Sequence, residues 1–321
     1  MVPKRLLKEI RKKRNKVFLV AAHIHLEGDA LGSELALASL LARLGKKVIV
    51  LNQDATPAEY EFLPGVESIR HTAQRPAYDA AILVDCSDVS RIGKISKTID
   101  KDRLLMNIDH HVSNTNFGDV NWVKPAASSA SEMVYELFRE LGVKIKKTEA
   151  LLLYTGILAD TGSFKYSTTS ARTHQVAIDL VGHGLDVYGI YRRLYESMDF
   201  DTVKSFAKII ETLRTNKART VAWITVRNHL IRKFPMLAEE TDNLIFFARC
   251  VKGVEVAALF KETKRNREVR VNLRSRGRAD VNKLAKIFGG GGHKMASGCT
   301  LKGRLNDVVK LVVREAGKKA A

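Results

Sequence analysis

The sequence predicts an α/β protein in which an N-terminal, doubly wound parallel sheet is followed by a smaller C-terminal α+β domain. Apolar runs of strand length alternate with segments of helical periodicity along the N-terminal part of the chain. The chain of 321 residues is also longer than one small hydrophobic core usually serves. We therefore expect two domains, residues 1–195 and 217–321, joined by a helical connector over residues 196–216.

The N-terminal domain begins with KVFLVAAH (16–23), a continuous apolar run of the kind expected for a strand that is buried on both faces. The next segment, residues 32–47, has leucines at helical spacing, and Gly45 is expected to cap the end of the helix. The same criteria predict further strands over 47–52, 78–88 and 103–111, and further helices over 129–142, 148–162, 171–184 and 186–196.

The C-terminal domain is expected to combine strands and helices without strict alternation. A helix over 201–215 leads into it. Strands are predicted over 219–226, 255–262 and 268–275, of which the last alternates apolar and polar residues with period two. A helix over 279–288 then precedes a glycine-rich loop and a final strand within 289–301.

The composition is typical of a globular protein without a membrane span. Hydrophobic residues make up 45% of the chain, and no apolar run reaches the roughly 18 residues that a spanning helix needs. The N-terminus lacks the apolar stretch of a secretory signal. Three widely spaced cysteines are more typical of free thiols than of disulfides, so we expect a cytoplasmic protein.

The net charge of +19 is unevenly distributed along the chain. Residues 201–321 hold 27 Lys and Arg against 11 Asp and Glu, a net charge of +16. Residues 1–16 hold 8 basic residues against 1 acidic residue, a net charge of +7. A strongly basic C-terminal part favours an anionic ligand such as a nucleotide or nucleic acid, with solubility as the simpler alternative.

Polar side chains gather where the predicted strands and helices end. His23, Glu27 and Asp29 follow the first strand at positions i, i+4 and i+6, and Gly28 is expected to let the backbone turn between them. Asp85 follows the third strand. Since ligands bind beyond the carboxyl ends of parallel strands, we expect these side chains to lie together. The other members of the set are His110, which follows the fourth strand, and Asp160, at the end of a buried helix.

Four carboxylates and two imidazoles in one place predict a metal site. Burying four unpaired carboxylates together would be prohibitively costly without cations. Mixed imidazole and carboxylate ligands suit manganese, iron or zinc, and magnesium to a lesser degree. Two such ions can activate a water between them and neutralise a phosphoryl oxygen.

The segment GGGGHKMASG (289–298) predicts a second ligand site. Glycines let a backbone approach a ligand closely, and their amides can hold phosphate oxygens. Its place between a helix and a strand disfavours a flexible linker, and Arg274 at a strand end could pair with a phosphate.

Taken together, these motifs resemble the DHH phosphoesterase family, whose hallmark is the triplet Asp109-His110-His111. The resemblance extends over nearly the whole chain. It includes the motifs HIHLEGDALGS (23–33), LVDCSD (83–88), IDHHVSN (108–114), LADTGSFKYSTTS (158–170) and VNLRSRG (271–277). The glycine-rich segment is similar to that of the DHH-associated domain. This pairing is most similar to nano-RNases of type A, which hydrolyse oligoribonucleotides and 3′-phosphoadenosine-5′-phosphate.

The resemblance implies roles for individual residues. One manganese ion would be held by His23, Glu27 and Asp85, and a second by Asp29, Asp85, His110 and Asp160, with Asp85 as the bridge. His111 would face the scissile phosphate, and Asp109 would orient the histidines. The nucleotide would be held by Arg274, Ser275, Gly290, Gly291, Gly292 and His293.

By the same resemblance, the substrate would be a short RNA or nucleotide held in a cleft between the two domains. A homodimer is compatible with the sequence. The first loop departs from the family pattern, since Glu27 stands where the family usually has aspartate. Magnesium, zinc and iron therefore stay open as alternatives to manganese. Rival functions are a single-strand exonuclease, an inorganic pyrophosphatase or polyphosphatase, and a catalytically weak nucleotide- or RNA-binding protein.

Overall fold

The computed structural model describes residues 1–71, 76–234, 241–263 and 267–320. The chain divides into two compact units, unit 1 (Met1–Ser197) and unit 2 (Met198–Ala321). Within the described residues no helix is both long and apolar enough to cross a membrane.

Unit 1 contains a five-stranded sheet in the order β2-β1-β3-β4-β5, and every pair of neighbours is parallel. This confirms the predicted α/β fold of the N-terminal domain. The strands are β1 (Val17–Ala21), β2 (Lys47–Val50), β3 (Ala80–Val84), β4 (Leu104–Asp109) and β5 (Val120–Val123). The helices are α1 (Lys4–Arg11), α2 (Gly28–Arg43), α3 (Ala130–Leu141), α4 (Lys147–Asp160), α5 (Ala171–Val181) and α6 (Val187–Tyr195).

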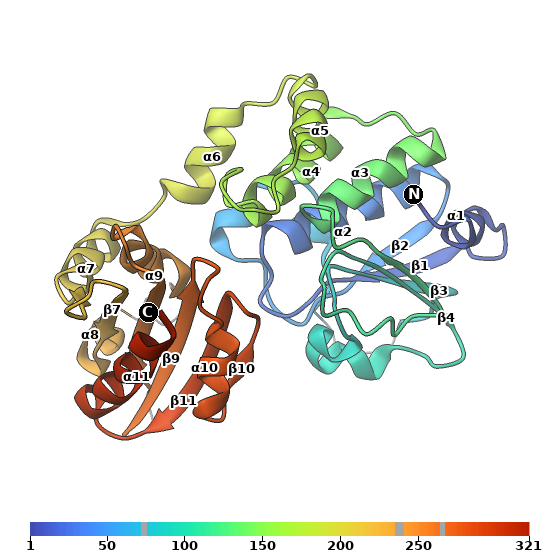
Figure 1. Ribbon diagram of the computed structural model, residues 1–321. Coiled ribbons are helices and arrows are strands. Elements are labelled where there is room, and N and C mark those ends of the chain that lie inside the picture. The colour runs from blue at the N-terminus through green and yellow to red at the C-terminus, as the bar shows by residue number, and fades with distance from the viewer. Residues whose placement is uncertain (72–75, 235–240, 264–266, 321) are drawn as a thin grey trace. The chain divides into compact units, whose positions relative to one another are not determined.

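The two faces of this sheet are covered differently. Figure 1 shows the helices α2, α3 and α4 stacked on one face, where they enclose the larger core. The opposite face is covered by η3 (Val89–Thr98), whose Ile92 and Ile95 pack against Leu19 and Leu83 of the sheet. Two further 3₁₀ turns, Ala58–Tyr60 and Val66–Ser68, lie between β2 and β3.

Helix ends agree with their local sequence. The hydroxyl of Ser129 accepts a hydrogen bond from the backbone N–H of Glu132 and caps α3, and Gly142 ends that helix at φ 70°. The start of α2 differs from the sequence prediction. The helix begins at Gly28, not at residue 32, so Asp29 belongs to its first turn and not to a loop. Gly28 is part of the helix and does not make a turn. Its lack of a side chain is needed for packing, because a Cβ atom there would lie 2.6 Å from that of Ala159 of α4.

Unit 2 is built on a six-stranded mixed sheet in the order β10-β11-β9-β8-β7-β6. Only β7 and β8 pair in parallel among these neighbours. The strands are β6 (Arg214–Thr215), β7 (Val221–Val226), β8 (Val256–Glu262), β9 (Glu268–Ser275), β10 (Gly291–Gly292) and β11 (Ala296–Lys302). The helices are α7 (Phe200–Ile210), α8 (Asn228–Lys233), α9 (Thr241–Cys250), α10 (Val281–Ile287) and α11 (Leu305–Ala320).

Two separate cores flank this sheet. Helices α10 and α11 pack on one face, against Val269, Val271 and Leu273 of β9. On the other face Phe206 and Ile209 of α7 pack against β7. The segment 196–216, expected as a connector, thus contains a helix and a strand that belong to the body of unit 2.

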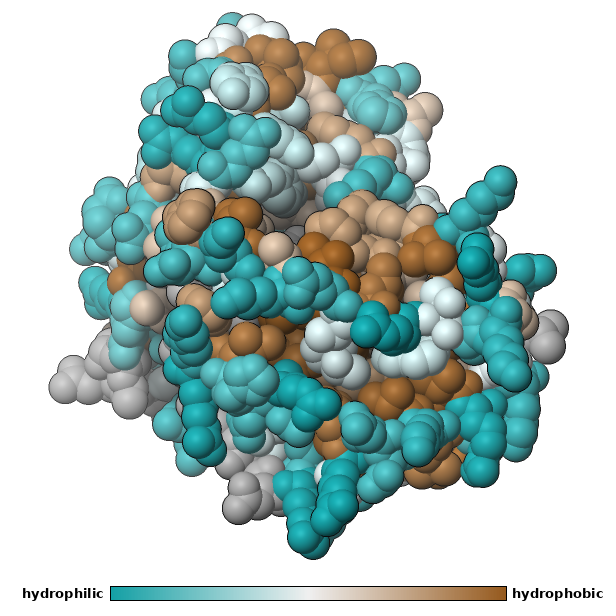
Figure 2. Space-filling view, turned by 90° about the vertical axis from the view of Figure 1, so that its left-hand side faces the viewer, coloured by the Kyte–Doolittle hydropathy of each residue, from teal (hydrophilic) through white to brown (hydrophobic). Residues whose placement is uncertain are grey.

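The surface combines hydrophilic and hydrophobic areas. Figure 2 shows hydrophilic side chains over most of the face that it presents, with smaller hydrophobic areas between them. A mixed surface of this kind is normal for a folded protein.

Candidate metal centre

The strand order places a switch point between β1 and β3. The chain moves from β1 outward to β2 and then returns to the other side of β1 with β3. Ligands of open parallel sheets bind beyond the strand ends at such a point. His23 follows β1, Asp85 follows β3, and His110 follows β4, so the predicted ligands surround this position.

The first group of side chains is formed by His23, Glu27 and Asp85, whose ligand atoms lie within 4.8 Å of one another. Nε2 of His23 is 3.2 Å from Oδ2 of Asp85 and 3.9 Å from Oε1 of Glu27. Nδ1 of His23 is 2.7 Å from the carbonyl oxygen of Ile24, which fixes the ring with Nε2 toward the carboxylates.

The second group is formed by Asp29, His110 and Asp160. Their possible ligand atoms also lie within 4.8 Å of one another. Nε2 of His110 is 3.5 Å from Oδ2 of Asp160 and 3.4 Å from Oδ1 of Asp85. Asp85 therefore lies between the two groups, with one carboxylate oxygen toward each histidine.

Two buried atoms of the cluster lack hydrogen-bond partners among the described residues. They are Oδ1 of Asp85 and Nε2 of His110. Asp85 is 1% exposed and has a left-handed backbone with φ 55°, an uncommon conformation for a residue with a side chain. These two atoms face each other at 3.4 Å without forming a hydrogen bond. Buried carboxylates and imidazoles that hydrogen bonds do not satisfy suit divalent cations as ligands.

The charges of the cluster depend on one another. Burial disfavours the imidazolium forms, but Asp85 outweighs burial and raises the pKa of His23 to about 9 and that of His110 to about 10. Burial and the charge of Asp85 raise the pKa of Asp29 to about 6, and burial and Asp29 raise the pKa of Asp160 to about 8. Without metal, bound protons therefore offset part of the negative charge of the carboxylates. Bound cations would displace these protons.

Asp29 is held by the start of another helix. Its Oδ2 accepts a hydrogen bond from the backbone N–H of Ala130 at 2.6 Å, and its Oδ1 accepts one from that of Ser131 at 2.8 Å. These amides are the free donors in the first turn of α3, and they stabilise a carboxylate at this end of the helix. Asp29 therefore joins the metal cluster to the helical layer.

The helices that carry Asp29 and Asp160 cross at two glycines. A Cβ atom on Gly32 of α2 would lie 2.4 Å from the carbonyl oxygen of Leu152, and one on Gly156 of α4 would lie 2.0 Å from Oγ of Ser131. Only glycine permits this close approach of the backbones. We expect this close packing to set the distance between the carboxylates of Asp29 and Asp160.

His111 adopts a different position from His110. Its Nδ1 is 2.7 Å from Oδ1 of Asp109, and its side chain is 39% exposed. It also lies within 4.8 Å of Asp85 and His110, measured between possible ligand atoms. Asp109 is fully buried, and its Oδ2 accepts a hydrogen bond from Asn114 at 2.6 Å. Asp109 thus orients the ring of His111 and leaves Nε2 available.

Sequence reasoning did not assign a role to Asn114. Its amide also donates to the carbonyl oxygen of Cys86 at 3.1 Å and to Oδ1 of Asn107 at 2.8 Å, and so connects the segments after β3 and β4. Its signal in the sequence was its position as the last residue of the motif IDHHVSN.

Unit 2 has a cavity of about 620 Å³ on the face of its sheet opposite to α10 and α11. Arg270, Asn272 and Arg274 line it from alternate positions of β9, together with Gly291 and Gly292 of the glycine-rich segment. Oδ1 of Asn272 is buried and has no hydrogen-bond partner among the described residues. Arg270 and Asn272 were not singled out from the sequence, although the period-two pattern places them on the face of Arg274.

Other predicted contacts of unit 2 lie outside this cavity. The hydroxyl of Ser275, on the opposite face of β9, donates to Oε1 of Glu255 at 3.0 Å and accepts from the N–H of Gly277 at 2.9 Å. Gly290 packs so closely against the carbonyl oxygen of Gly298 that a Cβ would lie 2.2 Å from it. His293 lies in the exposed turn between β10 and β11. None of these three residues is among those that line the cavity, and their roles in substrate binding stay predictions.

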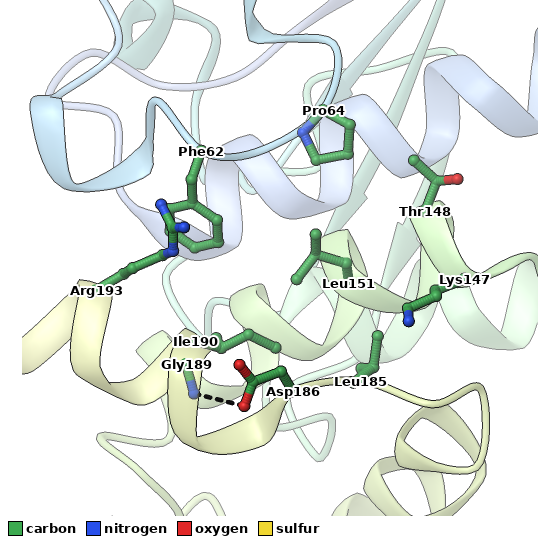
Figure 3. Close-up of a pocket in the computed structure, with 10 residues that line it drawn as sticks. All are labelled: Phe62, Pro64, Lys147, Thr148, Leu151, Leu185, Asp186, Gly189, Ile190 and Arg193. Atoms are coloured by element: carbon green, nitrogen blue, oxygen red, sulfur yellow. Dashed lines mark hydrogen bonds between the residues drawn. The ribbon is translucent and has the colours of Figure 1, made fainter.

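A further cavity of about 530 Å³ in unit 1 contains no member of the metal cluster. Figure 3 shows it between the N-terminal end of α4, helix α6 and the segment after β2. Its lining is mostly apolar, and the guanidinium of Arg193 lies over the ring of Phe62 at 5.2 Å. Among its lining residues only Asp186 has a carboxylate, and one oxygen of that carboxylate accepts a hydrogen bond from the backbone N–H of Gly189 at 2.9 Å.

Comparisons with known proteins identify the family of the chain. The DHH family, N-terminal domain, matches residues 17–157, and the DHHA1 domain matches residues 244–318. The structure is similar to the crystal structure of an exopolyphosphatase-related protein from Bacteroides fragilis, with a TM-score of 0.90 and 25% identity. That likeness covers 98% of this chain and 95% of the other.

Two curated proteins named bifunctional oligoribonuclease and PAP phosphatase NrnA are similar over most of their length. The protein from Thermus thermophilus is 31% identical over 93% of this chain and 88% of its own length. The protein from Bacillus subtilis is 27% identical over 87% of each chain. These matches confirm the resemblance found in the motifs: the chain belongs to the DHH family and carries a C-terminal DHHA1 domain.

Proposed function

We propose that this protein is a phosphoric ester hydrolase that uses two divalent cations, most favourably manganese, to cleave short oligoribonucleotides and 3′-phosphoadenosine-5′-phosphate. The observation that carries the proposal is the position of Asp85 between two groups of metal-capable side chains. The substrate class is supported by the names of the two curated relatives, which cover most of this chain.

The proposed metal ligands follow the two groups. His23, Glu27 and Asp85 would hold one ion, and Asp29, Asp85, His110 and Asp160 would hold the other. When bound, the pair would lower the pKa of a water and neutralise charge on the phosphoryl group. Manganese is favoured because the donors are nitrogen and oxygen atoms only, without a thiolate. The longer side chain of Glu27, 49% exposed, is the ligand with the most freedom to adjust.

His111 would act on the substrate itself. Hydrogen bonding to Asp109 raises the pKa of His111 above its usual value, which favours the imidazolium form near neutral pH. With Nδ1 held by Asp109, Nε2 can donate a hydrogen bond to a phosphoryl oxygen or a proton to the leaving sugar oxygen. Asp109 would be a positioning residue in this reaction.

The cavity of unit 2 would bind the nucleotide. Arg270 and Arg274 can pair with phosphate oxygens, and the backbone of Gly291 is open because a Cβ there would meet no atom within 4 Å. The amide of Asn272 offers donors and an acceptor for a base or sugar. Such a pocket is superfluous for inorganic pyrophosphate, which argues for nucleotide substrates.

The test is hydrolysis by metal-stripped protein with and without added manganese. The substrates are an RNA dinucleotide, 3′-phosphoadenosine-5′-phosphate and inorganic tripolyphosphate. We expect manganese-dependent release of nucleoside monophosphate or phosphate from the first two. Asp85→Asn should abolish turnover and reduce the metal content, and Asp102→Asn, the same change on an exposed turn, should leave both unchanged.

The other outcomes point to the rival functions. Turnover of tripolyphosphate alone would replace the proposal with a polyphosphatase. Metal binding without any turnover would contradict the hydrolase assignment, and the absence of bound metal would favour a nucleotide-binding protein.

A further inference from the structure

A basic cavity of about 580 Å³ lies at the edge of unit 1 where strands β1 and β2 begin. Five Lys and Arg residues line it, and no Asp or Glu does. The lining residues are Ile10, Arg11, Lys13, Lys16, Val17, Leu44, Gly45, Lys46 and Lys47.

The walls of this cavity are held together by hydrogen bonds. Nζ of Lys46 donates to the carbonyl oxygen of Lys12 at 2.7 Å and to that of Asn15 at 2.9 Å. The backbone N–H of Lys47 donates to the carbonyl oxygen of Lys16 at 2.8 Å. The turn before β2 is thereby joined to the segment after α1, and the cavity is part of the fold.

The other four cations take no part in these hydrogen bonds, although Lys16 is attracted by the carboxylate of Asp79. Arg11, Lys13, Lys16 and Lys47 form no ion pair and no side-chain hydrogen bond within the described part of the chain. One carboxylate, Asp79, lies near the rim, and its Oδ2 already accepts hydrogen bonds from the N–H groups of Lys16 and Val17. Like charges gathered around one hollow repel each other, and an anion between them would remove that repulsion.

The chemistry of the lining favours phosphate groups. Guanidinium and ammonium groups pair well with phosphate oxygens. No aromatic side chain lines the cavity, so it offers no surface on which a base could stack. Recognition would therefore concern the sugar–phosphate backbone and not the bases.

This cavity is separate from the metal cluster on the same sheet. The cluster follows the ends of β1, β3 and β4, whereas the cavity lies at the start of β1. The five residues of β1, at about 3.3 Å each, place about 17 Å between the two sites. A ligand in the cavity thus does not compete with a dinucleotide at the cluster.

We infer that this cavity is a second phosphate site, which binds the backbone of single-stranded RNA away from the catalytic centre. It would retain longer RNA on the protein while short fragments are processed. Its binding is sequence-independent and salt-dependent, because it rests on Lys and Arg contacts to phosphates.

The test is equilibrium binding of a fluorescent single-stranded RNA about 12 nucleotides long to the full-length protein, with chelator present to prevent cleavage. The variant is Arg11→Ala/Lys13→Ala/Lys47→Ala. None of these three side chains forms a hydrogen bond that joins the walls of the cavity. The matched control is Lys4→Ala/Arg5→Ala/Lys8→Ala, which removes the same charge from exposed positions of α1 outside the cavity. Urea denaturation checks that all three proteins are folded.

We expect the cavity variant to bind RNA several-fold more weakly, with the slope of log Kd against log salt lower by about 2, or about 0.7 per lost contact. The control should bind like the parent protein. Equal weakening by both variants would assign the effect to net charge and overturn the site, as would no weakening by either. If tripolyphosphate binding depends on the three residues and RNA binding does not, the site takes a free polyphosphate and the RNA assignment is wrong. Because no hydrolysis is measured, these outcomes are independent of the proposed activity.

Discussion

Gly156→Ala tests whether the helix crossing sets the geometry of the metal cluster. Gly156 lies on α4, one turn before Asp160, and faces Ser131 of α3 and Asp29 of α2. A Cβ added there would lie 2.0 Å from Oγ of Ser131, 2.8 Å from its Cβ and 2.9 Å from Oδ1 of Asp29. The added methyl group therefore meets both a metal-binding carboxylate and the helix that holds it.

The size of the displacement follows from these distances. The hydroxyl of Ser131 can rotate away, but its Cβ cannot. The contact at 2.8 Å is about 0.6 Å shorter than the 3.4 Å at which ordinary contact begins, and that to Asp29 is about 0.5 Å shorter. Overpacking of this kind costs about 1–3 kcal/mol, and the better helix propensity of alanine offsets about 1 kcal/mol. We expect the free energy of unfolding to fall by about 0–2 kcal/mol.

The effect on the metal site should be larger than the effect on stability. A ligand displaced by about half an ångström no longer matches the geometry that a divalent cation requires, and misplacement on this scale costs up to about 100-fold in activity. We expect a drop of 10- to 100-fold in manganese affinity, measured by calorimetry. Urea denaturation without metal gives the stability in parallel.

Two further variants make the experiment decisive. Gly317→Ala is the same change in α11, where the added Cβ meets only Asn216 Nδ2, at 3.8 Å, so it should stabilise the protein slightly and leave metal affinity unchanged. Ser131→Gly combined with Gly156→Ala removes the clashing Cβ and should restore part of the affinity. If Gly156→Ala bound manganese like the parent protein, the crossing would not control the site and the reasoning would be refuted.

Three other predictions concern the charges of the metal cluster, the role of Asp109 and the cavity of unit 2. Metal binding near neutral pH should release protons, because the pKa of His23 is about 9 and that of His110 about 10 without metal. Affinity should therefore rise between about pH 7 and pH 9, which calorimetry in buffers of different ionisation enthalpy would show. Asp109→Asn should lower kcat about 10- to 100-fold and shift the pH profile to lower pH, since His111 loses the partner that raises its pKa; an unchanged profile would contradict this role. Arg270→Ala should raise KM for the nucleotide without changing the urea midpoint, whereas Ser275→Ala should lower the urea midpoint and leave KM unchanged.

The metal cluster was accessible to sequence reasoning because its residues are marked by where they occur. His23, Asp85 and His110 each end a strong apolar run, and parallel strand ends meet at one edge of a sheet. The α/β fold and the family followed from the same motifs and are confirmed. The roles of His23, Asp85 and His110 as metal ligands stay predictions.

The features of the structure that differ from the sequence predictions depend on packing between segments that are distant in the chain. Nothing in the local sequence shows that α2 begins at Gly28, because the stabilising contact is Asp29 with the start of α3, about 100 residues away. Ser275 was predicted to contact the substrate beside Arg274, and in the structure its hydroxyl donates to Glu255, which immediately precedes the neighbouring strand β8. Such partners become visible only when the strands are paired.

The wide separation of the candidate ligands has a consequence for folding kinetics. They extend from His23 to Asp160, so the cluster exists only after the sheet has formed and α2 has crossed α4. Contacts between residues this far apart in the chain form late in folding, because closing the long loop costs entropy before the contacts can stabilise the fold. A cation bound there stabilises the native state and not the transition state, so added manganese should slow unfolding and leave the refolding rate unchanged in stopped-flow experiments. The metal would thus determine how long the folded domain survives, and not how it is reached.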